Sequence, residues 1–173
     1  LAHELLSHSS CRLPSLLSSY NSSPVQIERV SEDIEIVEVA ALVRTTLTQL
    51  VRNSLHSVNK KYGDFDPSSG QEDPRLIIIS PKYLDDYSLK MRVIDNGHGV
   101  PEELLSKIWE PGITTKEDGN GMGLPTGRIL IESFGGELKI KNAPEGGAVA
   151  TITIPANHIQ IIERKVELDD PNQ

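Results

Sequence analysis

The sequence predicts an α/β fold, a two-layer sandwich in which a mixed, mostly antiparallel sheet carries helices on one face. Short stretches with alternating apolar residues indicate strands, whereas between about residues 38 and 60 the apolar residues recur with a helical period. The predicted order is β, β, long α, β, β, short α, glycine-rich loop, α, β, β. A doubly wound parallel sheet would instead alternate single strands with helices.

The first strands are predicted at residues 24–30 and 33–37, where apolar and polar residues alternate. The long helix at 38–60 then places its apolar residues on one face: Val39, Val43, Leu47, Leu50, Val51 and Val58. Its opposite face is polar: Thr45, Gln49, Arg52, Asn53, His56 and Lys60. For any one of these polar residues, a solvated helix face is the simple interpretation.

The second half contributes strands at 75–80, 88–95, 137–142 and 148–155, and helices at 101–109 and 122–134. Turn-forming residues fill 62–74, which predicts an exposed loop, and the first two of these strands form a hairpin. Pro101 suits the first position of a helix, where its missing N–H is harmless. Gly135 and Gly136 end the later helix. Glycine, threonine and charge over 110–121 indicate a mobile segment.

One domain is predicted, with a tail at each end. Eight serines and Pro14 within residues 1–23 indicate a flexible linker or the end of an upstream helical region. Residues 24–157 form the folded domain, and 158–173 an acidic tail. Because the chain begins with Leu rather than Met, we expect it to be part of a longer protein.

Charge and cysteine content exclude some functions. Seventeen basic and 25 acidic side chains give a net charge of −8, which disfavours a nucleic-acid surface. The single cysteine, Cys11, has no internal disulfide partner, which indicates a reducing compartment. No apolar run approaches the roughly 20 residues that cross a bilayer. We therefore expect a cytoplasmic domain, and the full-length protein is free to carry a membrane anchor.

The segment VIDNGHGVP, residues 93–101, places an acid and two glycines directly after a buried strand. A carboxylate at Asp95 needs hydrogen-bond donors in such a place, and a purine amino group is one. Gly97 and Gly99 would let a flat ring lie against the backbone. An Asx turn leaving the strand explains the same tripeptide.

A second glycine run, Gly119, Gly121 and Gly123, lies at the start of the predicted helix at 122–134. Outward-facing N–H groups at a helix start can hold phosphate, although a loop hinge would explain the glycines nearly as well. The run lacks the βαβ setting of a dinucleotide fold and the Gly-Lys-Ser/Thr ending of a P-loop. Asn53 on the long helix could ligate Mg²⁺ through its amide oxygen, with His56 close by.

Four blocks in sequence order, QLVRNSLHS, DNGHGVPEELLSKIWEPGITTK, GNGMGLPTGRILIESFGGELKI and GGAVATITIP, resemble the ATP-binding domain of sensor histidine kinases. This group belongs to the gyrase, heat-shock-90 chaperone, histidine kinase and MutL superfamily. The resemblance spans residues 24–155 and implies a Bergerat fold. It also implies that MgATP binds and that the γ-phosphate passes to a histidine on a dimerisation hairpin outside this chain. A response regulator, and a homodimer in the full-length context, follow as expected partners.

The resemblance implies roles for individual residues. Asn53 matches the Mg²⁺ ligand and Asp95 the acid that recognises the adenine amino group. Asn53 and Lys116 are the implied catalytic residues, with Lys116 as a phosphate contact from the lid over residues 108–116. The implied ATP-binding set is Asn53, His56, Asp95, Gly97, Gly99, Lys116, Gly119, Gly121, Gly123 and Leu124.

Several positions depart from the family pattern. Gln49 stands where hydrolytic relatives carry a glutamate base, which argues against rapid ATP hydrolysis. Gly112 replaces an aromatic residue, and Trp109 is either a lid anchor or part of the core. Ala148 replaces a threonine and receives no ligand contact. His3 and Glu4 resemble the His-Glu pair of a phosphoacceptor helix, but Pro14 and the serines interrupt the sequence that follows, so a linker histidine is the favoured interpretation. An ATPase clamp and a non-catalytic nucleotide-binding module remain alternative functions.

Overall fold

The computed structural model describes residues 10–114, 116 and 119–162. The strands are β1 (Cys11–Arg12), β2 (Val25–Ile27), β3 (Ile34–Ile36), β4 (Ile77–Tyr83), β5 (Leu89–Asp95), β6 (Glu137–Asn142), β7 (Ala148–Ile154) and β8 (Ile159–Ile161). The helices are α1 (Leu13–Leu17), α2 (Ala40–Tyr62), α3 (Glu102–Leu105) and α4 (Gly123–Glu132), with short 3₁₀ helices η1 (Ser18–Tyr20), η2 (Pro67–Ser69) and η3 (Ala156–His158).

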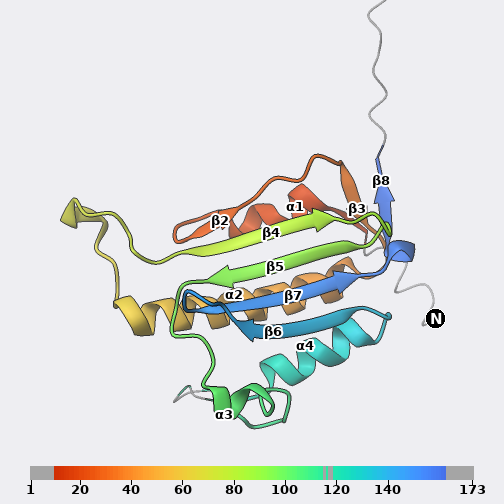
Figure 1. Cartoon of the computed structure of the whole chain (residues 1–173). Coiled ribbons are helices and arrows are strands. Elements are labelled where there is room, and N and C mark those ends of the chain that lie inside the picture. The colour runs from red at the N-terminus through yellow and green to blue at the C-terminus, as the bar shows by residue number, and fades with distance from the viewer. Residues whose placement is uncertain (1–9, 115, 117–118, 163–173) are drawn as a thin grey trace, which may run out of the picture.

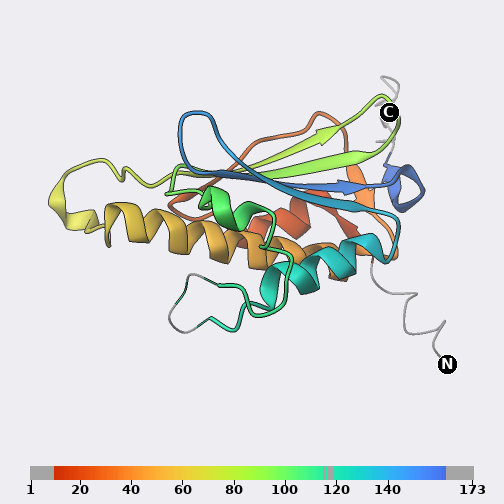
Figure 2. The ribbon, with the colours of Figure 1, turned by 60° about the horizontal axis from the view of Figure 1, so that its bottom comes forward.

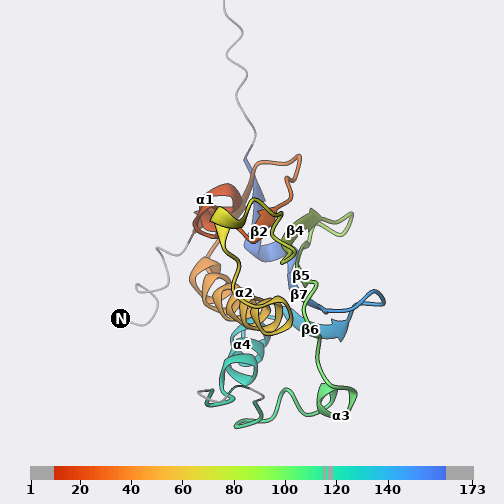
Figure 3. The same ribbon diagram turned by 90° about the vertical axis from the view of Figure 1, so that its left-hand side faces the viewer.

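A five-stranded sheet in the order β2-β4-β5-β7-β6 forms one layer (Figure 1). Only β2 and β4 pair in parallel, and the other three pairings are antiparallel. Helices α2 and α4 lie on the same face of this sheet (Figures 2 and 3). The predicted fold class is therefore confirmed. The predicted strand at 33–37 joins a separate small sheet, β1-β3-β8.

Helix α2 supplies the centre of the core. All six apolar residues predicted for its inner face are buried, and Val43, Leu47 and Val58 are fully inaccessible. They belong to one cluster with strand residues such as Met91 and Ile152. Full burial of such a side chain contributes about 1.5–3 kcal/mol. Because the inner face is anchored in this way, the polar face of α2 has a defined orientation.

Helix α4 packs closely against α2 at a glycine. A Cβ on Gly127 would come within 3.2 Å of Thr46 Cγ2, a tight contact that would require Thr46 to shift, so glycine suits this separation of the two helices. The Thr46 hydroxyl donates a hydrogen bond to the Gly127 carbonyl oxygen at 3.5 Å. This contact offsets the low helix propensity of a mid-helix glycine.

The N-terminal expectation requires correction. Residues 10–23 are not a flexible linker, because α1 buries Leu13, Leu16 and Leu17 in the core. These leucines follow the i, i+3, i+4 spacing of one helical face, whereas the serines among residues 10–23 are exposed. The predicted tail also starts too early, because β8 pairs with β3. Residues 1–9, including His3, and 163–173 lie outside the described residues.

Leu16→Ala is expected to lower the free energy of unfolding by about 2 kcal/mol, because it leaves a cavity where a fully buried side chain was. Chemical denaturation followed by circular dichroism measures the change. Ser15→Ala, an exposed position in the same helix, is the matched control and should change stability by less than about 0.5 kcal/mol. Equal stability of the two variants would mean that α1 does not belong to the core.

The helix predicted at 101–109 is shorter than expected. Pro101 is the residue before the first turn, with φ −53° and ψ 134°, and α3 covers only Glu102–Leu105.

Within the described residues, no helix is both long and apolar enough to span a membrane.

Candidate functional site

The Asp95 side chain lies at the end of β5 and is only 6% exposed. Its Oδ1 accepts hydrogen bonds from the N–H groups of Gly97, at 3.0 Å, and Ala148, at 3.3 Å. Its Oδ2 accepts one from the Ser54 hydroxyl of α2, at 2.8 Å. The Gly97 bond is the Asx turn considered above, so the turn and the buried acid are features of the same residue. All three neighbours are donors, as a carboxylate requires.

The two glycines after Asp95 are required by contacts inside the protein. A Cβ on Gly97 would overlap the Ser57 side chain of α2. Gly99 has φ +74°, and a Cβ there would come within 2.8 Å of Asn142 Oδ1. The space in the Cβ direction of Gly97 is filled by α2, so a contact inside the protein accounts for this glycine, and a flat ring against its backbone stays a prediction. Both glycines hold the turn close to the rest of the domain.

Asn53 connects α2 to the segment that follows α3. Its Oδ1 accepts a hydrogen bond from the Lys116 ammonium group at 2.6 Å, a short charge-assisted contact. The next residue along the helix, Ser54, contacts Asp95, so Asn53 and Asp95 lie on the same side of the sheet. Thus the structure brings together three of the predicted residues, Asn53, Asp95 and Lys116, through a single helix.

Positive charge surrounds Asn53. Burial and the nearby Arg52 guanidinium lower the pKa of Lys116 below its ordinary value. Burial, followed by the charges of Lys116 and Lys60, lowers the pKa of His56. His56 is therefore mainly neutral at pH 7, so its ring can offer an N–H donor but carries no full charge. The like charges that lower these pKa values would favour a polyanion bound here.

The second glycine run packs against the segment that precedes it. Gly121 has φ +65°, and a Cβ there would overlap the Gly112 backbone, whose N–H donates to the Gly121 carbonyl oxygen at 3.3 Å. The Gly119 N–H donates to the Lys116 carbonyl oxygen at 3.2 Å. The expectation that the whole run presents N–H groups outward is thus wrong for Gly119. Gly123 and Leu124 form the start of α4, where the helix dipole is positive.

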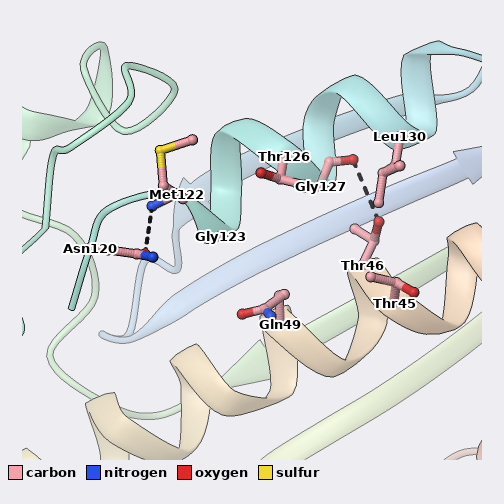
Figure 4. A pocket seen from close by; sticks show the side chains of 9 residues that line it. All are labelled: Thr45, Thr46, Gln49, Asn120, Met122, Gly123, Thr126, Gly127 and Leu130. Atoms are coloured by element: carbon pink, nitrogen blue, oxygen red, sulfur yellow. Dashed lines mark hydrogen bonds between the residues drawn. The ribbon is translucent and has the colours of Figure 1, made fainter. Parts of the chain in front are cut away.

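A cavity of about 190 Å³ lies between α2 and α4 (Figure 4). Its lining residues are Thr45, Thr46, Gln49, Asn120, Met122, Gly123, Thr126, Gly127 and Leu130. A Cβ on Gly123 would come within 3.2 Å of Gln49 Oε1, so the glutamine side chain lies against the start of α4. The cavity adjoins the second glycine run and does not include Asp95.

Sequence reasoning missed two supports of the site. Ser54 is 6% exposed and occupies an inward position of α2 between Leu50 and Val58. A serine in an otherwise apolar helix face needs a partner, and that signal could have identified it. The Ala148 N–H was not foreseen either, since a backbone group leaves no trace in the sequence.

Trp109 packs at the edge of the core, with the Arg128 guanidinium 5.1 Å from its ring centre.

The mixed sheet with its helices on one face defines a domain of the Bergerat class. The family described as histidine kinase-, DNA gyrase B-, and HSP90-like ATPase matches residues 39–158, more than half of the chain. The chain therefore belongs to this family, as its motifs predict.

Individual relatives agree with this assignment. Sporulation kinase A of Bacillus subtilis is 33% identical over 113 residues, which cover 65% of this chain and 16% of that protein. The catalytic domain of the histidine kinase ThkA superposes with a TM-score of 0.65 at 23% identity, covering 85% of this chain and 94% of that one. Full-length ShkA, solved in complex with AMPPNP, superposes with a TM-score of 0.57 at 19% identity, covering 76% of this chain and 26% of that one. The two structural likenesses show the fold alone, and this chain spans a small part of the kinase it matches in sequence.

Proposed function

We propose that this chain binds MgATP and transfers the γ-phosphate to a histidine on a helical hairpin outside it, as the catalytic domain of a two-component sensor kinase. The main support is that α2 carries both Ser54, bonded to the buried Asp95, and Asn53, bonded to Lys116. The Asp95 carboxylate, which suits the amino group of adenine, and the Asn53 amide, which has basic side chains close by, therefore lie on the same side of the sheet. The relatives named as sporulation and sensor kinases support the same function.

The adenine end of the proposed site is formed around Asp95, whose carboxylate accepts a hydrogen bond from the base amino group. Gly97 and Gly99 hold the turn that keeps Asp95 in place. Gly121, Gly123 and Leu124, at and before the start of α4, lie along the phosphates, and Gly119 supports Lys116 through its N–H. His56 donates to a phosphate oxygen, and the anion would raise its pKa toward the ordinary value.

The Asn53 amide oxygen is the hard, neutral ligand that Mg²⁺ accepts alongside water and phosphate oxygens. When bound, the metal would counter the negative charge of the phosphates. In the structure the Lys116 ammonium group contacts this same oxygen. Repulsion between the metal and the ammonium group would favour release of Lys116 from Asn53, and its ammonium group is then available for a phosphate.

The proposed reaction is an in-line displacement. The acceptor imidazole nitrogen forms a P–N bond as the bond between the γ-phosphorus and its bridging oxygen breaks, and ADP leaves. The imidazole is itself the nucleophile, so Gln49 need not act as a base. Asn53 and Lys116 position and neutralise the transferring group.

Lys116→Met is expected to weaken MgATP binding about 5-fold, because a charged phosphate contact is lost. Isothermal titration calorimetry at fixed Mg²⁺ measures the affinity. Lys139→Met on β6 is the control, since its ammonium group pairs with Glu137 and is exposed. If both variants bind MgATP alike, Lys116 does not contact the phosphates.

A full-length protein that includes the proposed helical hairpin tests the proposed function directly. Incubated with γ-labelled ATP and Mg²⁺, it should form an acid-labile phosphohistidine and pass the label to a response regulator. Steady-state ATP hydrolysis without phosphohistidine would favour an ATPase clamp. MgATP binding with neither reaction would favour a nucleotide-dependent interaction module. In the proposed function the intact protein is a homodimer, and its catalytic domain works in the cytoplasm.

A further inference from the structure

The contact between Ser54 and Asp95 joins two buried side chains, each only 6% exposed. A serine within a helix commonly bonds the carbonyl oxygen four residues earlier, as Thr45 and Thr48 of the same helix do. The Ser54 hydroxyl instead donates across to the end of β5, at 2.8 Å. The hydroxyl therefore serves Asp95 rather than the backbone of its own helix.

The hydrogen-bonding capacity of Asp95 is nearly filled. A carboxylate oxygen accepts about two hydrogen bonds. Oδ1 already has two donors, the N–H groups of Gly97 and Ala148, whereas Oδ2 has one, from Ser54. Among the residues that the structure describes, one acceptor position therefore remains, on Oδ2, the oxygen that the Ser54 hydroxyl also contacts.

We infer that Ser54 is a positioning residue that sets the base specificity of the site. It holds Oδ2 so that the remaining lone pair accepts one donor, the exocyclic amino group of a 6-aminopurine. A 6-oxopurine places an acceptor against the same oxygen and is rejected. This inference rests on the proposed function, because it assigns the base to Asp95.

The test compares ATP with the triphosphate of unsubstituted purine riboside, which lacks the exocyclic amino group. Both are titrated into the whole chain by calorimetry at fixed Mg²⁺. Ser54→Ala should weaken ATP binding about 10-fold and leave the affinity for the analogue unchanged. Ser54→Thr, which keeps the hydroxyl, should restore most of the preference for ATP. A purely structural defect would weaken both nucleotides equally.

Thr48→Val, which removes a hydroxyl of the same helix, is the matched control. The Thr48 hydroxyl donates to the Arg44 carbonyl oxygen at 2.9 Å and contacts the Tyr20 hydroxyl at 2.7 Å, so its partners lie away from Asp95 and from the turn after β5. This variant should keep the wild-type ratio of the two affinities. Thermal melting of each variant confirms that it is folded before titration.

Two results would overturn the inference. If Ser54→Ala leaves the ratio unchanged while Asp95→Asn lowers it, Asp95 reads the base without help from Ser54, and the proposed function stands. If the ratio responds to neither substitution, the base does not lie against Asp95, and the proposed adenine site fails together with this inference.

Discussion

Asp95→Asn is expected to lower ATP affinity about 100-fold while the domain stays folded. Replacing the carboxylate removes a charge-assisted hydrogen bond to the base, worth about 1.5–3 kcal/mol, and turns an amide N–H toward the adenine amino group. The fold survives because the asparagine oxygen can still accept the N–H groups of Gly97 and Ala148. Its amide nitrogen can donate to the Ser54 hydroxyl, which rotates to accept. Calorimetry gives the affinity, and thermal melting checks the fold.

Asp86→Asn is a matched control for this substitution. Asp86 also accepts a backbone N–H and a hydroxyl, both from Ser88, but it lies at the turn between β4 and β5, at the opposite end of β5 from Asp95. The Asp86→Asn variant should bind ATP with the affinity of the unsubstituted chain. Wild-type affinity in Asp95→Asn would remove Asp95 from the adenine site.

Asn53→Ala is expected to lower phosphotransfer in the full-length protein by a factor on the order of 100 to 1,000, as loss of a group that positions transition-state charge does. The response to Mg²⁺ should also disappear from nucleotide binding by the chain alone, because the amide oxygen that would ligate the metal is gone. Phosphohistidine formation and calorimetry with and without Mg²⁺ measure the two effects.

Asn59→Ala provides the comparison for this second substitution. Asn59 lies on the same helix, and its amide oxygen accepts a hydrogen bond from Arg75 at 2.9 Å, away from Lys116. The Asn59→Ala variant should retain the wild-type response of nucleotide binding to Mg²⁺. The metal-binding assignment fails if the Asn53 and Asn59 variants respond to Mg²⁺ alike.

The long helix and the central strands could be predicted because their residues obey one rule along their whole length. Val43, Leu47 and Val58 recur at helical spacing, and each is fully buried. Asp95 could be predicted as a buried acid in the same way, since an acid directly after an apolar strand needs hydrogen-bond donors wherever it lies. The prediction that Asn53 is a metal ligand came from the motif and from its place on the polar face of the helix.

Other features depend on contacts between distant parts of the chain. The serines of residues 1–23 suggested disorder, because composition does not reveal that Leu13, Leu16 and Leu17 share one face of a short helix. The glycines near Asp95 were explained by a ligand, whereas Gly97 is required by the approach of Ser57 from a helix some 40 residues earlier. Likewise, no local pattern indicates that Lys116 donates to Asn53.

Adjacent residues on an α-helix point about 100° apart and differ in height by about 1.5 Å. Asn53 and Ser54 are such neighbours, and one reaches Lys116 while the other reaches Asp95. A small rotation or slide of α2 would therefore disturb both contacts at once. Recognition of the base and retention of the metal should in consequence be energetically coupled. The effects of combined substitutions at the two positions on MgATP affinity should depart from additivity, because both residues are held by the same helix, which sets the distance between them.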